Sequence, residues 1–500
     1  MVEFVADGPC GRAPWHERAK QCQLSFFLES LPGILRAIAL RSHLTPLAAA
    51  LALASLASTN AHASVASLFA VKSVRHIATA GAYAAADIYV QNCYDSGPGS
   101  LRQTVLDAKD GDYVDLRTLN CSKSKITLAP PSMGAGGEIV VPQNNLFIVG
   151  SSQSNLTISA NKQSRVFNHT GTGELTIWDG LTLADGQYVS SIANGGCIRS
   201  AGTVTLIGSK VTNCMAHGNQ GARGGGVYAA GQVKLFNSIV STSEVSVDSG
   251  GFAYGGGLYS KDGFGSFFST IENNKAYAAG SSNYVLGGGA AVVNNPGIYA
   301  EVKNTLVSGN EAKGGYAYAG GIFAGSTTPI SIVNSTVANN TAHSPIQHSS
   351  AGGILAGNTL NLANSTVVGN FAYTGGAGVH ASSFTTVYSS IVALNSGPPG
   401  IIDVFVGGTI EGGGNDIIFS NKPPLPTDLA VDPKLGPLQD NGGPANTMLP
   451  LLGSPVIGKG NNQQGDKFDQ RGQGHPRVSG ASVDIGATQF DTIFADGFGP

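Results

Sequence analysis

The sequence predicts an all-β protein, a right-handed parallel β-helix in which each coil of the solenoid is one sequence repeat. The first observation is a repeated phrase: AGGIFAGSTTPISIVNSTVANN at residues 319–340 returns as AGGILAGNTLNLANSTVVGN at residues 351–370. The second is that short β-prone runs alternate with Gly, Asn and Ser, without the period of a long helix. The third is composition, because 70 of the 500 residues are glycine and only 12% are charged, against a usual ~25%.

The repeat has a nearly constant length. Its reference position is the second residue of each Gly-Gly or Ala-Gly step, and successive references lie 30, 31, 32, 32, 32 and 25 residues apart. These reference glycines are Gly196, Gly226, Gly257, Gly289, Gly321, Gly353 and Gly378. Stacked coils would bring equivalent residues together at the ordinary strand spacing of ~4.8 Å.

A second column of equivalent positions carries amides. It begins at Ser243 and continues through Asn274, Asn310, Asn340, Asn370 and Asn395. In stacked coils each side-chain amide can donate to the next and accept from the one before, so we expect a structural asparagine ladder.

Both ends of the solenoid need closure, because an open coil exposes unpaired strand edges. Ser100 and Gln103 have the form of a helix-capping box, and Leu101, Val105 and Ala108 would form the apolar face of a short N-terminal cap helix. After Asn395 the repeat gives way to a Pro/Gly-rich stretch, which we expect to form an irregular C-terminal cap. We divide the chain into a preface and signal peptide (1–63), an N-terminal cap with the first coils (87–190), regular coils (191–400), a C-terminal cap (401–490) and a tail (491–500).

The N-terminal region has the pattern of an export signal. Arg36 and Arg41 precede the apolar run of residues 44–57, and Ala61-His62-Ala63 supplies small residues for cleavage near Ala63. The alternative is an amphipathic or buried helix. The long stretch before the signal suggests that translation starts downstream of Met1. We expect a secreted or cell-surface protein with no transmembrane segment in the mature chain.

Cysteine usage agrees with export. Cys10 and Cys22 lie in the stretch expected to be removed, which leaves an even number for an oxidising compartment. Those four, Cys93, Cys121, Cys197 and Cys214, permit three pairings, and sequence proximity favours Cys93 with Cys121 and Cys197 with Cys214. Their spacing is not that of a zinc site.

Two segments resemble a known family. Residues 92–116, NCYDSGPGSLRQTVLDAKDGDYVDL, resemble the N-terminal signature of secreted bacterial β-helix proteins. Residues 431–461, VDPKLGPLQDNGGPANTMLPLLGSPVIGKGN, and residues 469–489, DQRGQGHPRVSGASVDIGATQ, resemble the choice-of-anchor Q domain. The resemblance implies a pectate-lyase-like superfold on a secreted or surface protein, with no single activity. The chain departs from the pattern at Gly458, where the family has an acidic residue, and its last residues show no sorting motif.

Charge and side-chain chemistry narrow the function. The net charge of −3 and the lack of a basic run exclude a nucleic-acid binder. Acids in the coils are scattered, and Glu272 and Glu301 have different offsets from their reference glycines, so we predict no catalytic residue. His217, His343 and His380 share no offset, so we predict no metal site and no cofactor, with calcium left open.

Two sets of residues are candidate binding sites. The C-terminal set, Asp469, Arg471, Arg477 and Asp484, could bind an ion or a sugar acid, but internal pairing within an irregular cap is the favoured alternative. The second set lies five residues before the reference glycines and consists of Phe252, Tyr284, Tyr316, His348 and Tyr373. Rings in stacked coils would stabilise each other, which is the favoured interpretation, and an exposed row of them would also suit a glycan.

We therefore predict a monomeric secreted or surface β-helix that acts as an adhesive, structural or glycan-binding module. The alternative is a polysaccharide lyase or glycoside hydrolase on the same scaffold, because fold does not decide function.

Overall fold

The computed structural model describes residues 85–132, 136–151, 156–248, 250–293, 299–344, 346, 348–412, 416–418, 421–422, 429–479 and 482–491. The chain divides into two units, Met1–Ala85 and Ala86–Pro500, and the second contains every described strand. The predicted signal peptide, Cys10, Cys22 and tail residues 492–500 lie outside the described residues.

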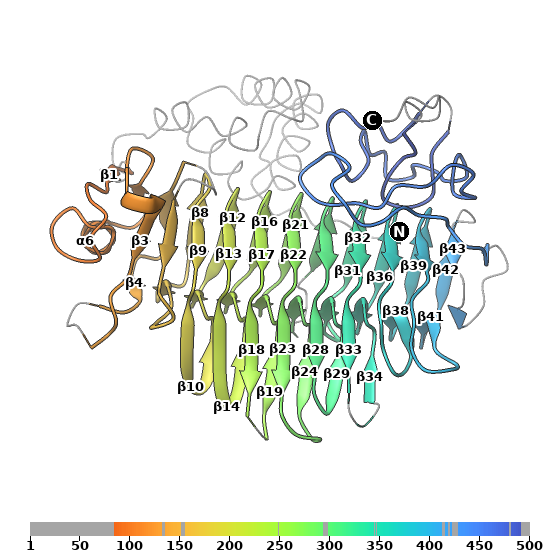
Figure 1. Ribbon diagram of the computed structural model, residues 1–500, viewed down its shortest axis with the longest axis horizontal. Helices are drawn as coiled ribbons and strands as arrows, with labels where there is room; N and C mark the ends of the chain where they lie inside the picture. The colour runs from red at the N-terminus through yellow and green to blue at the C-terminus, as the bar shows by residue number, and fades with distance from the viewer. Residues whose placement is uncertain are drawn as a thin grey trace, which may run out of the picture. The chain divides into compact units, whose positions relative to one another are not determined.

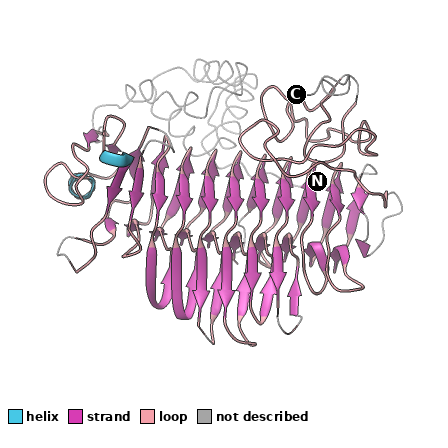
Figure 2. Cartoon of the chain, in the orientation of Figure 1, coloured by secondary structure: helices cyan, strands magenta, loops and turns pink. Residues whose placement is uncertain are grey.

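The strands stack into four parallel sheets, in which each strand pairs with its equivalent in the coil before and the coil after (Figures 1 and 2). The register follows the sequence repeat: Val302, Ile332 and Leu362 are direct Cα partners along one sheet, and all three are buried. Such columns of branched apolar residues form one continuous core inside the coils. The predicted all-β parallel solenoid is confirmed.

Three of the sheets form the walls of the solenoid. Sheet 1 consists of β1 (Asp87–Tyr89), β2 (Tyr113–Asp115), β5 (Leu146–Val149), β8 (Glu174–Trp178), β12 (Thr203–Ile207), β16 (Val233–Phe236), β21 (Phe264–Phe267), β26 (Ala300–Lys303), β31 (Ile330–Val333), β36 (Leu360–Ala363), β39 (Thr385–Tyr388) and β42 (Ile410–Gly412). Sheet 2 consists of β3 (Lys125–Thr127), β6 (Thr157–Ser159), β9 (Thr182–Ala184), β13 (Lys210–Thr212), β17 (Ile239–Ser241), β22 (Thr270–Glu272), β27 (Leu306–Ser308), β32 (Thr336–Ala338), β37 (Thr366–Val368), β40 (Ile391–Ala393) and β43 (Ile417–Ile418). Sheet 3 consists of β4 (Ile139–Val141), β7 (Phe167–His169), β11 (Ile198–Ser200), β15 (Val227–Ala229), β20 (Leu258–Ser260), β25 (Ala290–Val292), β30 (Ile322–Ala324), β35 (Ile354–Ala356), β38 (Gly376–Ala381), β41 (Ile402–Val406) and β44 (Asn421–Lys422).

The fourth sheet forms a projection that we call the fin, seen below the coils in Figure 1. Its strands are β10 (Gln187–Asn194), β14 (Met215–Arg223), β18 (Glu244–Val247), β19 (Phe252–Tyr254), β23 (Lys275–Ala278), β24 (Tyr284–Leu286), β28 (Glu311–Lys313), β29 (Tyr316–Tyr318), β33 (Thr341–His343) and β34 (His348–Ser350). In most coils of the fin an outgoing strand, such as β23, leaves the solenoid and a returning strand, such as β24, brings the chain back. The space between them is thin, because the buried side chains there are almost all alanine and valine, among them Ala276, Val285 and Ala317.

Two side-chain ladders run along the coils. In the asparagine ladder, Asn274, Asn310, Asn340 and Asn370 each donate through Nδ2 to Oδ1 of the next asparagine, at 2.9–3.0 Å, and the last acceptor is Asn395. A hydroxyl ladder lies between sheets 1 and 2, where the Ser335 and Ser365 backbone N–H groups donate to Oγ of Ser365 and Ser390.

Each ladder ends on an aspartate. Asn395 donates to Asp403 Oδ1 at 2.9 Å, and the Ser390 N–H donates to Asp416 Oδ1 at 3.0 Å. Both aspartates are buried.

The N-terminal end carries helix α6 (Leu101–Asp107), followed by a 3-10 turn at Ser122–Ser124. Ser100 is the N-cap and accepts the Gln103 N–H through Oγ, while Leu101 and Val105 are buried against β2 and β4. The Gln103 side chain turns forward to Asp107, so only half of the expected capping box forms.

The C-terminal segment, residues 429–479 and 482–491, packs along the side of the coils, which corrects the expectation of a cap across their end. Asn304 and Asn334 donate to the backbone carbonyls of Asp469 and Phe468 at 3.1 and 3.0 Å. Further along, Val456 and Ile485 pack in one buried cluster with Val368 and Ile391. The segment has almost no regular strand partners of its own. Side chains at the outward corners of the coils therefore supply hydrogen bonds to part of its backbone.

Candidate functional site

The returning strands of the fin bring four of the five predicted rings into one column. Phe252, Tyr284, Tyr316 and His348 are successive Cα partners in β19, β24, β29 and β34. The prediction for Tyr373 is wrong, because Tyr373 lies outside this column.

The reason for the exception is the length of its coil. The 25-residue interval before Gly378 has no returning fin strand, and Ser350 bridges Thr374, which places Tyr373 out of register. Its ring packs edge-on against His343 and Phe371, each with 5.3 Å between ring centroids.

The rings of the column stack on one another. Tyr284 and Tyr316 have centroids 5.0 Å apart with an interplanar angle of 15°, and Tyr316 and His348 are 5.3 Å apart at 28°. Stacking occupies both faces of Tyr316, so the interior of the column offers ring edges and not ring faces to a ligand.

Tyr284 is different because, among the described residues, a ring stacks on only one of its faces. Phe252 leans toward the preceding coil: it packs against Tyr254, and a Cβ at Gly221 would collide with its ring. Among the described residues no second ring stacks on Tyr284, whose side chain is 50% exposed.

A cluster of phenols that the sequence analysis missed adjoins this column. Tyr254 and Tyr318 point outward from the returning strands, and Tyr228 and Tyr259 stack on each other in sheet 3 with centroids 5.4 Å apart. The guanidinium of Arg223, at the end of β14, lies 4.3 Å from the Phe252 ring centroid and 5.7 Å from that of Tyr259. We call these five residues, Arg223, Tyr228, Tyr254, Tyr259 and Tyr318, the tyrosine cluster.

Burial tunes the chemistry of this cluster. It is the main cause that raises the pKa of Tyr254, Tyr259 and Tyr318. The nearby Arg223 guanidinium acts in the opposite direction on the pKa of Tyr254 and of Tyr259. These three phenols therefore stay protonated and can donate hydrogen bonds at neutral pH. A signal for the cluster was present, since its residues lie three before or two after the reference glycines.

The C-terminal set of charged residues is tied internally. Arg471 forms bidentate contacts to Asp469 and to Asp491, with shortest distances of 2.7 and 2.8 Å. Asp484 accepts the backbone N–H groups of Gly458 and Phe490 at 2.7 and 2.6 Å. This geometry favours internal pairing over an ion or sugar-acid site. Gly458 has φ +67°, a conformation that suits glycine at the position where the resembled family has an acid.

Arg477 completes this set in an unusual environment. It is fully buried, and Nη2 donates to the carbonyl of Gly486 at 2.5 Å, while Nε and Nη1 have no hydrogen-bond partner among the described residues. Burial lowers the pKa of Arg477 to about 10.

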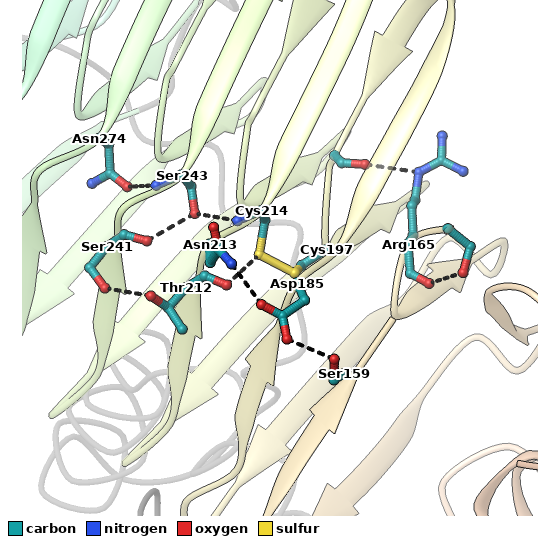
Figure 3. The surroundings of a disulfide bond; sticks show 12 residues. Ser159, Arg165, Asp185, Cys197, Thr212, Asn213, Cys214, Ser241, Ser243 and Asn274 are labelled. Atoms are coloured by element: carbon teal, nitrogen blue, oxygen red, sulfur yellow. Dashed lines mark hydrogen bonds between the residues drawn. A yellow bond between two sulfur atoms is a disulfide. The ribbon is translucent and has the colours of Figure 1, made fainter. Parts of the chain in front are cut away.

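Both predicted disulfides, Cys93–Cys121 and Cys197–Cys214, are present. Cys214 also precedes the first member of the asparagine ladder. Its N–H donates to Ser243 Oγ, and the Ser243 N–H donates to Asn274 Oδ1 (Figure 3). The second disulfide therefore lies where the ladder begins.

The acids and histidines considered in the sequence lie apart. Glu272 ends β22 in sheet 2, whereas Glu301 lies in β26 of sheet 1. His217 and His343 belong to outgoing fin strands, and His380 belongs to sheet 3. No group of three or more His, Cys, Asp or Glu side chains suited to a metal ion occurs within the described ranges.

No helix in the described part of the chain combines the length and apolarity that crossing a bilayer requires.

Comparisons with known proteins add little. No protein-family model matches the chain, and no curated protein matches it. Among solved structures it is similar to the crystal structure of pectate lyase Pel9A, with 13% identity, a TM-score of 0.39, and coverage of 81% of this chain and 98% of that chain. The solenoid fold rests on the strand pairing described above, and the choice-of-anchor Q resemblance stays a prediction.

Proposed function

We propose that this protein is a secreted or cell-surface β-helix that binds saccharides along the ring face of its fin. The observation that carries the proposal is the half-exposed ring of Tyr284, which stacks on Tyr316 through one face and carries no second ring among the described residues. A flat, preoriented ring suits the apolar face of a sugar, because little side-chain freedom is lost on binding.

The tyrosine cluster supports this proposal with polar chemistry. Among the described residues its phenol hydroxyls have no hydrogen-bond partner, so they are available to sugar hydroxyls. Two disulfides suit a protein that works in an oxidising compartment outside the cell.

A glycan array with the purified protein, followed by titration of the best hit, tests the proposal. Tyr284→Ala is expected to weaken binding about tenfold, because one ring contact is worth about 1 kcal/mol or slightly more. Tyr299→Ala is the matched control: Tyr299 is 51% exposed but lies outside the fin, so affinity should not change.

Two results would contradict the proposal. One is binding that survives Tyr284→Ala unchanged. The other is turnover, seen as unsaturated products or new reducing ends released from a polysaccharide, which would favour the enzyme alternative.

A further inference from the structure

Arg223 is a cation without a counter-ion in the described part of the chain. Its guanidinium makes no hydrogen bond and no ion pair there, and Nε is buried without a partner. Other arginines in similar settings are paired: Arg102 contacts Asp95 at 2.7 Å and Arg165 contacts Glu138 at 2.5 Å.

Packing against aromatic rings satisfies only part of the binding capacity of the Arg223 guanidinium. The rings of Phe252 and Tyr259 attract the guanidinium by cation–π interaction, which is worth about 0.5–2 kcal/mol. That attraction leaves the N–H groups of the planar guanidinium without hydrogen bonds. Two such parallel N–H donors match two oxygens of a carboxylate or a sulfate.

The position of Arg223 relative to Tyr284 is also informative. Arg223, Tyr254 and Leu286 are successive Cα partners, so Tyr284 lies two coils beyond Arg223. Two coils span about 10 Å, which is a distance that a short oligosaccharide can bridge.

We propose that Arg223 binds a carboxylate or sulfate group on a saccharide whose neighbouring sugar lies on Tyr284. This rests on the proposed function and narrows it to acidic saccharides. Tyr254 and Tyr259, protonated and beside the guanidinium, would donate to oxygens of the same sugar.

The test compares three oligosaccharides of equal length, one carrying uronic acids, one sulfated and one neutral, by calorimetric titration at low and high salt. For wild-type protein we expect tighter binding of at least one acidic oligosaccharide, weakened by salt. Arg223→Gln should lower that affinity about tenfold or more and leave neutral binding unchanged, whereas Arg223→Lys should lose less.

Lys313→Gln is the matched control. It removes the same charge from β28, an outgoing strand that does not carry the column of Phe252, Tyr284, Tyr316 and His348. A thermal melt of each variant checks that the fold is intact. Which acidic oligosaccharide responds to Arg223→Gln identifies the anion.

The outcomes separate the two proposals. Equal binding of acidic and neutral oligosaccharides, or equal losses in Arg223→Gln and Lys313→Gln, would overturn the role of Arg223 and leave saccharide binding by Tyr284 standing. Failure of all three oligosaccharides and of the glycan array would overturn both.

Discussion

His169 lies inside the solenoid with both ring nitrogens engaged. Nδ1 is 2.7 Å from Ser200 Oγ, and Nε2 is 2.9 Å from the carbonyl oxygen of Gln143. Burial lowers the pKa of His169, which is the dominant effect, while the two backbone carbonyls act against it. The folded protein therefore holds this ring neutral at pH values where the unfolded chain would protonate it.

The sign of the resulting pH dependence follows from proton counting. Below the ordinary histidine pKa of about 6.5, the unfolded chain binds more protons at this site than the folded protein, so stability falls as the pH is lowered. We expect the free energy of unfolding to decrease between about pH 8 and about pH 5, with a slope from His169 of at most about 1.4 kcal/mol per pH unit.

Urea unfolding across that range, for wild type and His169→Gln, measures the effect. The variant should be less stable at neutral pH but have a flatter profile. His348→Gln, at an exposed ring of the fin, is the control. An equally steep profile in His169→Gln would show that the buried ring does not contribute.

At the scale of the elements, the asparagine ladder fixes the register of the coils. Asn340 accepts from the N–H and Nδ2 of Asn310 and donates to Asn370 and to the carbonyl of Val307, all at 2.9–3.0 Å. Its side chain is fully buried, so water cannot replace these partners.

Asn340→Ala should destabilise the protein by about 3 kcal/mol, because it leaves buried donors of Asn310 without an acceptor. The unfolding midpoint in urea measures this loss. Asn120→Ala, at an exposed amide in the turn before β3, should change the midpoint little. Equal effects at the two positions would mean that the ladder adds no stability.

The same element shows what sequence could and could not predict. The ladder could be predicted because each coil repeats the demands of its neighbours at a fixed interval, and both disulfides could be predicted because each joins cysteines that are neighbours in the sequence. The sequence predicted the ring column correctly up to His348. The prediction failed at Tyr373, where the coil is shorter and the fin has ended. The tyrosine cluster escaped notice because its residues alternate between two columns on either side of a turn.

At the scale of the whole molecule, the position of the C-terminal segment could not be predicted. Some of its contacts with the coils use backbone carbonyls as acceptors for Asn304 and Asn334, and carbonyls leave no pattern in a sequence. The composition did indicate an irregular segment, but composition does not say which face it covers.

Val456→Asp tests how this segment is held. Val456 is fully buried against the coils, so a carboxylate there should detach the segment at a cost of about 3 kcal/mol or more. Hydrogen–deuterium exchange should rise in residues 435–490 and in β37 and β40, but not in β23 and β24. Leu452→Asp, at a side chain that is 78% exposed in the same segment, is the control. Unchanged exchange in Val456→Asp would contradict this packing.

The aspartate at the end of the asparagine ladder, Asp403, has a consequence for the size of the molecule. An asparagine passes a hydrogen bond onward because its amide both receives and gives, whereas the carboxyl group of Asp403 accepts from Asn395 and has no amide N–H to give. A further repeat copied onto this end would meet an acceptor where it needs a donor. The chemistry of Asp403 thus ends the asparagine ladder, and lengthening the solenoid by duplication would require exchanging this residue for one with an amide side chain.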